Sequence, residues 1–350
     1  MDFNYESLPG RVSFGRGQAA SNLASELTKL GLSRVMLVAG PSELDLAHRL
    51  IAGAADRVAV EFTNVLPHVP AEVAEEARAA AAEHSIDGLV SVGGGSTTGT
   101  AKIVALTTGL PIVAVPSTYA GSEMTPVWGM TTAARKETGV DRRVLPKSVI
   151  YDSELTRTMP KGLAVASGFN AMAHCVEAFW GPGANPITTL AAAEGMSALS
   201  RGLRGISGET IEESAFDDLL FGAYLAGSAF AVAGSGLHHK ICHALGGAFN
   251  LPHAETHTVV LPHVLAFNID SIGTDADRMA AALNADDAVE GLFDLEHQLG
   301  SPRNLEEVGL RADQLDEAIS VVSAKLPIAN PRPVSESDIA EILTAAFRGR

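Results

Sequence analysis

The first 150 residues alternate short apolar, β-branched segments with alanine- and glutamate-rich segments, and this alternation limits the folds open to the chain. Four segments have the continuous apolar character of strands buried on both faces: residues 34–40, 57–62, 87–95 and 111–117. A helix is predicted over 71–85, with glutamates near its start, where the helix dipole favours them. Strands that alternate with helices form parallel, doubly wound sheets, which bind ligands at the carboxyl ends of their strands.

The second half of the chain has a different composition. Beyond about residue 155, β-branched segments become rare and segments rich in Ala, Leu and Glu dominate, which predicts helices. We therefore expect an α/β domain over residues 1–155 and an all-α domain over residues 156–350. A chain of 350 residues is long enough for two cores of ordinary size. Its end, residues 326–347, predicts a proline-rich loop, a serine cap and a final helix.

Charge and composition exclude several classes of partner. The chain has 25 Lys and Arg against 41 Asp and Glu, a formal net charge of -16. Nucleic acid and anionic membrane surfaces attract proteins through a positive field, so we expect neither as a partner. Residues 219–236 are apolar, but their glycines and serines favour a helix buried in protein over a membrane span. Two cysteines without paired spacing, and a start unlike a signal peptide, predict a cytoplasmic protein.

A glycine-rich turn follows the third predicted strand. Gly93, Gly94 and Gly95 would let the backbone approach a diphosphate. The hydroxyl groups of Ser96 and Thr97 would add donors at the N-terminus of the following helix. The segment lacks the lysine of a P-loop and does not spell GxGxxG, but the combination of strand, glycines, hydroxyls and helix predicts a phosphate-binding turn.

The loop after the next predicted strand would lie beside this turn at the same edge of the sheet. It has the sequence PSTYAGSEMTPVWGMT over residues 116–131. Two interpretations are open, an ordinary polar loop and a wall for the rest of a dinucleotide. The candidates for such a wall are Thr118, Tyr119, Gly121, Ser122 and Thr125.

Histidines are concentrated in the predicted helical domain, where the stretch SGLHHKICHALGGAFNLPHAETH holds five of the chain's eleven. Helical spacing places Asn170 and His174 on one face of a helix, and His239 and His243 on one face of another. His253 follows a turn and would approach these helices from a loop. Histidines that gather from two helices and a loop indicate a shared site. Those interpreted as structural or supporting residues are His238, His257 and His263.

Four of these segments together resemble the iron-containing alcohol dehydrogenase superfamily: GGGST after a strand, PSTYAGSEMT, NAMAHCVEA and HKICHALGGAFNLPH. The resemblance extends over nearly the whole chain. It implies a Rossmann-like α/β domain that binds NAD(P), followed by an all-α domain, which is the dehydroquinate synthase-like fold, with cofactor and substrate in the cleft between them. It also implies a homodimer.

In metal-dependent members of that family, a carboxylate and three histidines bind Fe(II) or Zn(II). Matched by position, the ligands fall on Asn170, His174, His239 and His253, while His243 matches a further active-site histidine that is not a ligand. An asparagine oxygen is neutral and binds a divalent cation more weakly than a carboxylate does. With the short TYAGSE loop and the segment HVPAE, Asn170 resembles the maleylacetate reductase branch. This branch implies that no metal is required and that the metal positions are vestigial.

The same branch implies reduction of maleylacetate to 3-oxoadipate with NADH or NADPH, in the degradation of aromatic compounds. The double bond of maleylacetate is conjugated to a ketone, so hydride can add at the alkene carbon remote from the ketone and leave an enolate. Hydrogen-bond donors can stabilise the enolate oxygen. We expect His243 to deliver the proton. His174, His239 and His253 would hold the dicarboxylate, in part through positive charge when protonated.

The end of the first predicted strand bears on the choice of cofactor. Gly40 stands where several family members carry an aspartate that binds the adenosine ribose and repels a 2′-phosphate. Without that charge, we expect both NADH and NADPH to be accepted. Arg142, Arg143 and Lys147 are further candidates to bind the substrate carboxylates, although ordinary surface positions explain them better.

Three other functions remain open. A metal-dependent alcohol or polyol dehydrogenase would contain Fe or Zn and lose activity with a chelator. A lyase similar to dehydroquinate synthase would need a metal and a more basic phosphate site. A dinucleotide sensor would bind NADH without consuming it and would leave the histidines without a purpose.

Overall fold

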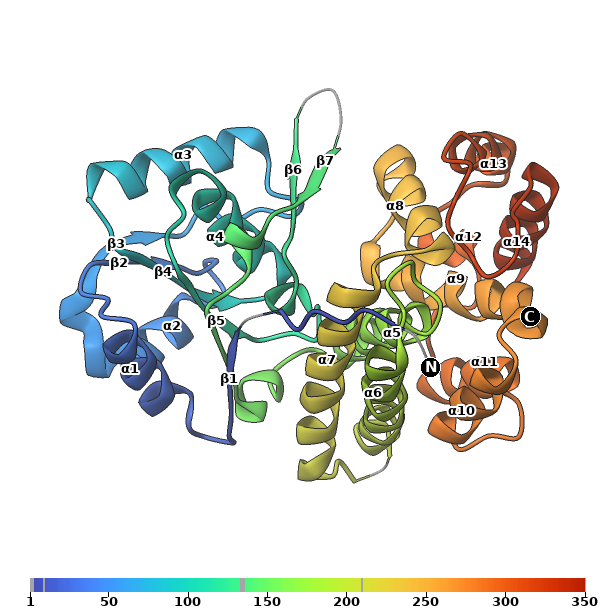
Figure 1. Ribbon diagram of the computed structural model, residues 1–350, viewed down its shortest axis with the longest axis horizontal. Coiled ribbons are helices and arrows are strands. Elements are labelled where there is room, and N and C mark those ends of the chain that lie inside the picture. Colours follow the sequence, from blue (N-terminus) through green and yellow to red (C-terminus); the bar gives the residue numbers. More distant parts are fainter. Residues whose placement is uncertain (1–2, 9, 133–135, 209, 350) are drawn as a thin grey trace. The chain divides into compact units, whose positions relative to one another are not determined.

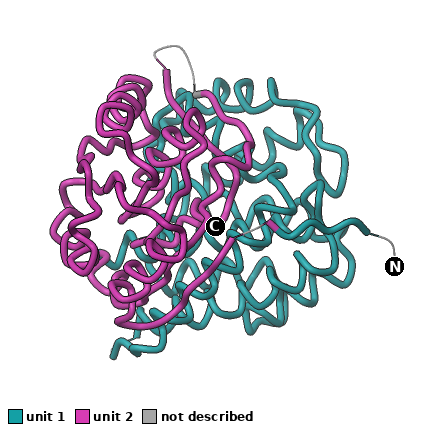
Figure 2. The backbone as a smooth tube through the Cα atoms, turned by 60° about the vertical axis from the view of Figure 1, so that its left-hand side comes forward, with its two compact units in different colours: residues 1–7, 160–350 teal, residues 8–159 magenta. Residues whose placement is uncertain are grey.

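The chain divides into two compact units in a computed structural model that describes residues 3–8, 10–132, 136–208 and 210–349. Figure 2 shows one unit of residues 8–159 and a second of residues 1–7 and 160–350. The division falls between Met159 and Pro160, slightly beyond the expected boundary at residue 155. Residues 3–7 belong to the second unit, which the composition of the chain does not indicate.

The first unit contains a six-stranded parallel sheet in the order β1-β8-β5-β4-β2-β3 (Figure 1). The four predicted strands are β2 (Val35–Val38), β3 (Val58–Phe62), β4 (Gly88–Gly93) and β5 (Ile112–Pro116). Two others, β1 (Arg11–Phe14) and β8 (Ser148–Tyr151), pair with each other and were not predicted. Each is only four residues long and includes a serine, so its apolar pattern is too short to distinguish a strand from a loop.

Helices cover both faces of the sheet (Figure 1), and each face has its own apolar core. The larger core, on one face, contains Val35 and Leu37 of β2 and Val90 of β4. Ile103 packs in the smaller core on the opposite face. A parallel sheet buried on both faces explains why its strands are almost continuously apolar. The helices are α1 (Ala19–Lys29) and α2 (Leu44–Ile51) on one face, and α3 (Ala71–Glu83) and α4 (Gly95–Thr108) on the other.

The segment after β5 is only partly a loop. It passes through a 3-10 turn, Ser122–Met124, and then forms the first strand of an antiparallel hairpin, β6 (Val127–Thr131) with β7 (Lys136–Val140). The hairpin stands apart from the main sheet.

The described residues of the second unit form helices joined by turns and loops and include no strand, as the composition predicts. Its helices are α5 (Lys161–Ala178), α6 (Pro186–Gly205), α7 (Glu213–Ala233), α8 (Leu237–Phe249), α9 (His253–Asn268), α10 (Thr274–Leu283), α11 (Ala288–Leu299), α12 (Leu305–Val308), α13 (Leu315–Ser323) and α14 (Glu336–Arg348). One apolar core joins α8 and α9 to the last three helices. Ser335 caps α14 by accepting a hydrogen bond from the backbone N–H of Asp338.

Helix α7 is long and apolar enough to cross a membrane by length and composition alone, and half of its most apolar window is buried. It packs closely against α6, because glycines let the two backbones approach. A Cβ on Gly222 would lie 2.7 Å from the side chain of Leu199. This contact is typical of a core helix in a bundle.

Candidate active site

The carboxyl ends of β2 and β4 lie at the point where the strand order of the sheet reverses, so that the sheet changes direction. From β2 the chain continues to β3 on one side, and from β4 it continues to β5 and β8 on the other. In open α/β sheets, ligands bind at such a point. The glycine-rich turn lies here, directly after β4.

The geometry of the turn requires glycine. Gly93 has a φ of +150°, and a Cβ on it would lie 2.5 Å from the hydroxyl oxygen of Thr97. A Cβ on Gly94 would meet the side chain of Thr118 at 3.1 Å. The turn and the loop after β5 are therefore in contact, and the N-terminus of α4 leaves backbone N–H groups for an anion.

A buried lysine that sequence reasoning missed holds the loop after β5. The ammonium group of Lys102 donates to the carbonyl oxygens of Ser122 (2.6 Å), Thr125 (2.8 Å) and Val127 (2.8 Å), and to the hydroxyl of Thr125 (3.1 Å). Burial lowers the pKa of Lys102 to about 7, and the nearby carboxyl of Glu123 acts in the opposite direction. A lysine within the apolar stretch TAKIVAL was the available signal.

These contacts separate the loop candidates into two groups. Thr125 is buried and its hydroxyl is occupied by Lys102. Tyr119 is fully buried, and burial raises its pKa to about 12. Both residues therefore support the loop from inside. Thr118 and Ser122 are only half-buried and remain candidates to contact a ligand.

In the helical unit, α5, α8 and α9 bring the predicted histidines into one cluster. Ring centroids lie 5.1 Å apart for His174 and His239, and 5.8 Å apart for His243 and His253. His257, which we interpreted as a supporting residue, connects the two pairs, at 4.7 Å from His239 and 4.4 Å from His253. Asn170 and His174 are buried, whereas His243 and His253 are exposed.

His253 belongs to a helix and not to a loop, contrary to expectation. Asn250 adopts the left-handed conformation that ends α8, and α9 begins at His253 directly after Pro252. Because α9 already begins at His253, residues His253 and His257 lie one turn apart on the same face of this helix.

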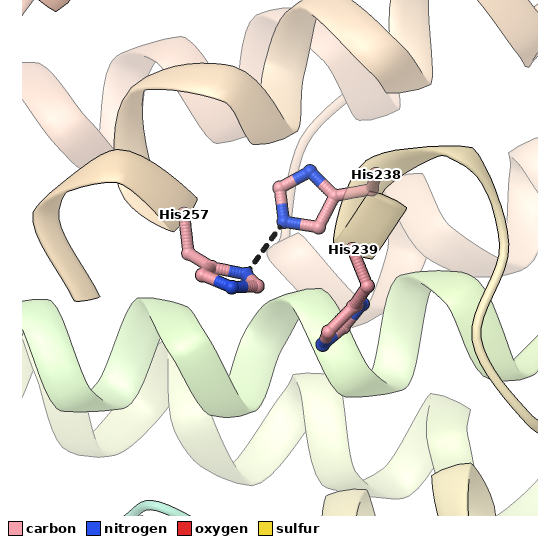
Figure 3. Close-up of side chains that lie close together, drawn as sticks. All are labelled: His238, His239 and His257. Atoms are coloured by element: carbon pink, nitrogen blue, oxygen red, sulfur yellow. Dashed lines mark hydrogen bonds between the residues drawn. The ribbon is translucent and has the colours of Figure 1, made fainter. Parts of the chain in front are cut away.

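Figure 3 shows His257 facing His238 and His239 across the space between their helices. The Nε2 atom of His238 and the Nδ1 atom of His257 lie 2.9 Å apart and share a hydrogen bond. This hydrogen bond connects His238, whose ring is fully buried, to the rest of the cluster.

A buried carboxylate, Glu177 of α5, orients His239. Its Oε2 atom accepts from the Nδ1 of His239 at 2.6 Å and from the backbone N–H of Gly236 at 3.0 Å, and its Oε1 accepts from the N–H of His238 at 2.7 Å. A proton on Nδ1 leaves the Nε2 lone pair of His239 free for a ligand. Burial raises the pKa of Glu177 to about 7, and these backbone donors lower it. Sequence reasoning missed Glu177, although it lies on the helix face of Asn170 and His174.

The buried imidazoles are neutral at neutral pH. Burial lowers the pKa of His174 and of His238 to about 3, and that of His239 and His257 well below its usual value. Neighbouring histidines lower each pKa further. The expectation that protonated His174 and His239 supply positive charge is therefore wrong, because burial penalises the charged form.

Several polar atoms of the cluster are buried without a hydrogen-bond partner among the residues described. They are the Oδ1 of Asn170, the Nδ1 of His174, and the Nε2 atoms of His239 and His257. Two overlapping sets of three histidines, His238, His239 and His257, and His243, His253 and His257, have ligand atoms within 4.8 Å of one another. Unpartnered imidazole nitrogens at such distances fit a divalent transition metal such as iron or zinc.

The basic candidates lie on the surface. Arg142, Arg143 and Lys147 are all exposed, and Arg143 forms an ion pair with Asp141 at 2.7 Å. Exposed positions of this kind are typical of an ordinary protein surface.

Comparison with known proteins matches both units to one family. Residues 9–153 match the family described as iron-containing alcohol dehydrogenase, and residues 164–347 match its C-terminal part, described as Fe-containing alcohol dehydrogenase family, C-terminal. A maleylacetate reductase from Delftia acidovorans is 43% identical over 100% of this chain and 99% of its own length. One from Burkholderia cepacia is 42% identical over 99% and 98%.

Solved structures agree. An iron-containing alcohol dehydrogenase from Corynebacterium glutamicum has a TM-score of 0.96 and 50% identity, covering 100% of this chain and 98% of that one. A maleylacetate reductase from Agrobacterium tumefaciens has a TM-score of 0.95 and 38% identity, covering 100% and 99%.

These findings correct the expectation that no metal is required. That expectation depended on Asn170, one neutral ligand at a carboxylate position. The matched family is iron-containing, and the histidines lie at distances that allow them to hold a metal. Replacing one of several ligands weakens a metal site without removing the imidazoles that define it. Over both of its units, the chain belongs to the iron-containing alcohol dehydrogenase family.

Proposed function

We propose that this chain reduces the carbon–carbon double bond of maleylacetate with NAD(P)H to give 3-oxoadipate, in the degradation of aromatic compounds. The observation that carries the proposal is the full-length similarity, at 38% to 43% identity, to relatives named maleylacetate reductase. Similarity over the whole length includes both the glycine-rich turn and the histidine cluster.

The α/β unit would hold the cofactor at the point where the sheet changes direction. Backbone N–H groups at the start of α4 would bind the diphosphate, because Gly93, Gly94 and Gly95 leave no side chains over the turn. The hydroxyl groups that could add hydrogen bonds belong to Ser96, Thr97, Thr118 and Ser122. When bound, the nicotinamide would supply the hydride.

The helical unit would hold a divalent metal, iron or zinc, through Asn170, His174, His239 and His253. These four positions are the ones that resemble the family's ligands. The unpartnered Oδ1 of Asn170 and Nε2 of His239 support the assignment, and each of the two histidine sets at ligand distance contributes one member, His239 or His253. When bound, the metal would supply Lewis-acid stabilisation of the negative charge that develops on the substrate oxygen. An amide and three imidazoles are neutral as metal ligands, so they would leave the cation's charge largely uncompensated. That charge suits a substrate with two carboxylates in a protein of formal net charge -16.

His243 is our candidate for proton delivery to the substrate carbon. It is exposed at the rim of the cluster, 5.8 Å from His239 and from His253 between ring centroids. An exposed imidazole can exchange its proton with water between turnovers, which a fully buried one cannot do readily.

We further propose a cytoplasmic homodimer. Strand β1 is one of the two edges of the main sheet, and the backbone groups of an edge strand can pair with a second copy. Cys175 and Cys242 are both buried free thiols, which suits a reducing compartment.

The test is the rate of NADH oxidation with maleylacetate, compared with the rate of NAD reduction with simple alcohols and diols. We expect rapid turnover with maleylacetate and little with the alcohols. Turnover confined to the alcohols would overturn the proposal in favour of an alcohol or polyol dehydrogenase.

A further inference from the structure

A carboxylate occupies the end of β2, where Gly40 itself provides no side chain. Gly40 is buried two residues after the end of β2. A Cβ built on Gly40 would lie 2.8 Å from the Oε2 atom of Glu43. The carboxylate of Glu43 therefore fills the space in which a longer side chain at position 40 would begin.

Local hydrogen bonds hold Glu43 in this position. Its backbone N–H donates to the carbonyl oxygen of Gly40 at 3.0 Å, which closes a tight turn. The hydroxyl of Ser42 donates to the same Oε2 atom at 2.7 Å. Glu43 is only half-buried, so its carboxylate can still contact a ligand.

The turn lies level with the glycine-rich turn on the neighbouring strand. Strand β2 pairs with β4 in parallel, with Val38 opposite Ser91. Continued two residues beyond this pair, the same register would bring Gly40 level with Gly93. The carboxylate and the proposed diphosphate site are thus on adjacent strands at the point where the sheet changes direction.

An acidic side chain in that position discriminates between the two nicotinamide cofactors. A carboxylate accepts hydrogen bonds from the hydroxyl groups of the adenosine ribose and repels a phosphate on the 2′ oxygen. We propose that Glu43 selects NADH over NADPH. The proposal rests on the proposed function, since it requires the cofactor to bind at this edge of the sheet.

The proposal reverses the expectation that both cofactors are accepted. That expectation considered only position 40, where the chain has glycine. The missing carboxylate is supplied three residues later, by a side chain that folds back over the turn. It also precedes the glycine-rich turn in the chain, whereas the common dinucleotide motif has its acidic residue about 20 residues after the glycines.

The experiment compares dissociation constants for NADH and NADPH, measured by nicotinamide fluorescence, in the wild-type protein and in Glu43→Gln. Glutamine keeps the size and the hydrogen-bonding capacity of glutamate but removes the charge. We expect the wild type to bind NADH more tightly, and the variant to shift the ratio of the two constants toward NADPH by on the order of tenfold. A matched control is Glu61→Gln, which removes an exposed charge from the neighbouring strand β3.

Equal shifts in both variants would show that only the overall charge matters and would overturn the assignment. A ratio unchanged in Glu43→Gln, with both nucleotides still bound, would also overturn it while leaving the proposed function intact. If neither nucleotide binds to the wild type, the dinucleotide site itself is wrong, and the assignment of Glu43 fails with it.

Discussion

The two units would bind their ligands in different ways. At the sheet edge of the α/β unit, the candidate site is made mainly of backbone groups, and glycines are required because any side chain would fill the space. In the helical unit, the site is made of side chains from three helices, and several of their polar atoms are buried without a partner. A backbone site depends on local conformation, whereas a side-chain site depends on the identity of each residue and on what orients it. Substitutions should therefore damage the two sites independently.

The largest effect is expected at the histidine cluster. His243→Ala should lower turnover with maleylacetate by about a thousandfold, because general acid catalysis contributes on this scale. Steady-state kinetics and NADH fluorescence would measure turnover and cofactor binding, and the NADH dissociation constant should not change. His263→Ala, on the same α9 helix as His253, is the control and should retain activity. Retention of most of the turnover in His243→Ala would remove His243 from the mechanism.

A smaller effect is expected from the residue that orients His239. Glu177→Gln should weaken metal binding by about 10 to 100-fold, the range for partners that position a metal ligand. Three groups donate to the two oxygens of Glu177: the backbone N–H groups of Gly236 and His238, and the Nδ1 of His239. Glutamine has only one oxygen, so its NH2 group must face either the N–H of His238 or the Nδ1 of His239. Metal content and the visible spectrum of the cobalt-substituted protein would report the change.

Glu296→Gln is the matched control for this variant. Glu296 is also buried in the helical unit, and one of its oxygens has no partner among the described side chains. Its substitution should leave the cobalt spectrum unchanged. The same loss of metal in both variants would mean that any change to a buried glutamate destabilises the unit.

The corresponding substitution in the α/β unit is Gly93→Ala, in the glycine-rich turn. A positive φ and a 2.5 Å approach to Thr97 make alanine costly there by about 1–3 kcal/mol. We expect NADH binding to weaken by about tenfold while metal content stays the same. Gly109→Ala, at the other end of α4, also has a positive φ but no close neighbour, and should leave NADH binding unchanged. Loss of metal in Gly93→Ala would contradict the independence of the two sites.

The smallest effect per group concerns pH and the stability of the metal-free protein. The pKa values of His174 and His238 are lowered to about 3, and those of His239 and His257 are also lowered, so below about pH 6.5 protons bind the unfolded chain first. As the pH falls below about 6.5, each of these histidines lowers the free energy of unfolding by up to about 1.4 kcal/mol per pH unit. The stability is present above about pH 6.5 and is lost as the pH falls toward 3.

Glu177 acts in the opposite direction, because its pKa is raised to about 7 and the folded state takes up its proton first. Glu123 and Glu296, whose pKa values burial also raises, act in the same direction, so three carboxyls offset part of the effect of the four imidazoles. Urea unfolding at about pH 7.5 and about pH 5.5 would measure the net change. Equal stability at both values would contradict the prediction that the buried imidazoles dominate the pH dependence.

The predicted features were those with a local pattern. Buried strands and helical spacing placed β4 before the glycine-rich turn and Asn170 one turn from His174. The missed features depend on the fold. Glu177 becomes part of the site only when α5, α8 and α9 pack together, and only that packing shows that His257, predicted as a supporting residue, connects the two histidine pairs. Glu43 matters only because its side chain folds over Gly40. The expectation that Asn170 makes a metal unnecessary was wrong for the same reason, because it judged a site formed by several residues from one position.

The most direct measurement is the position of hydrogen transfer. The protein would be given maleylacetate and NADH carrying two deuterium atoms at C4 of the nicotinamide, and the product would be analysed by NMR. We predict 3-oxoadipate with its ketone intact and deuterium on the former alkene carbon remote from that ketone. Deuterium on a newly formed alcohol carbon, with the double bond retained, would contradict reduction of the double bond and identify a carbonyl reductase.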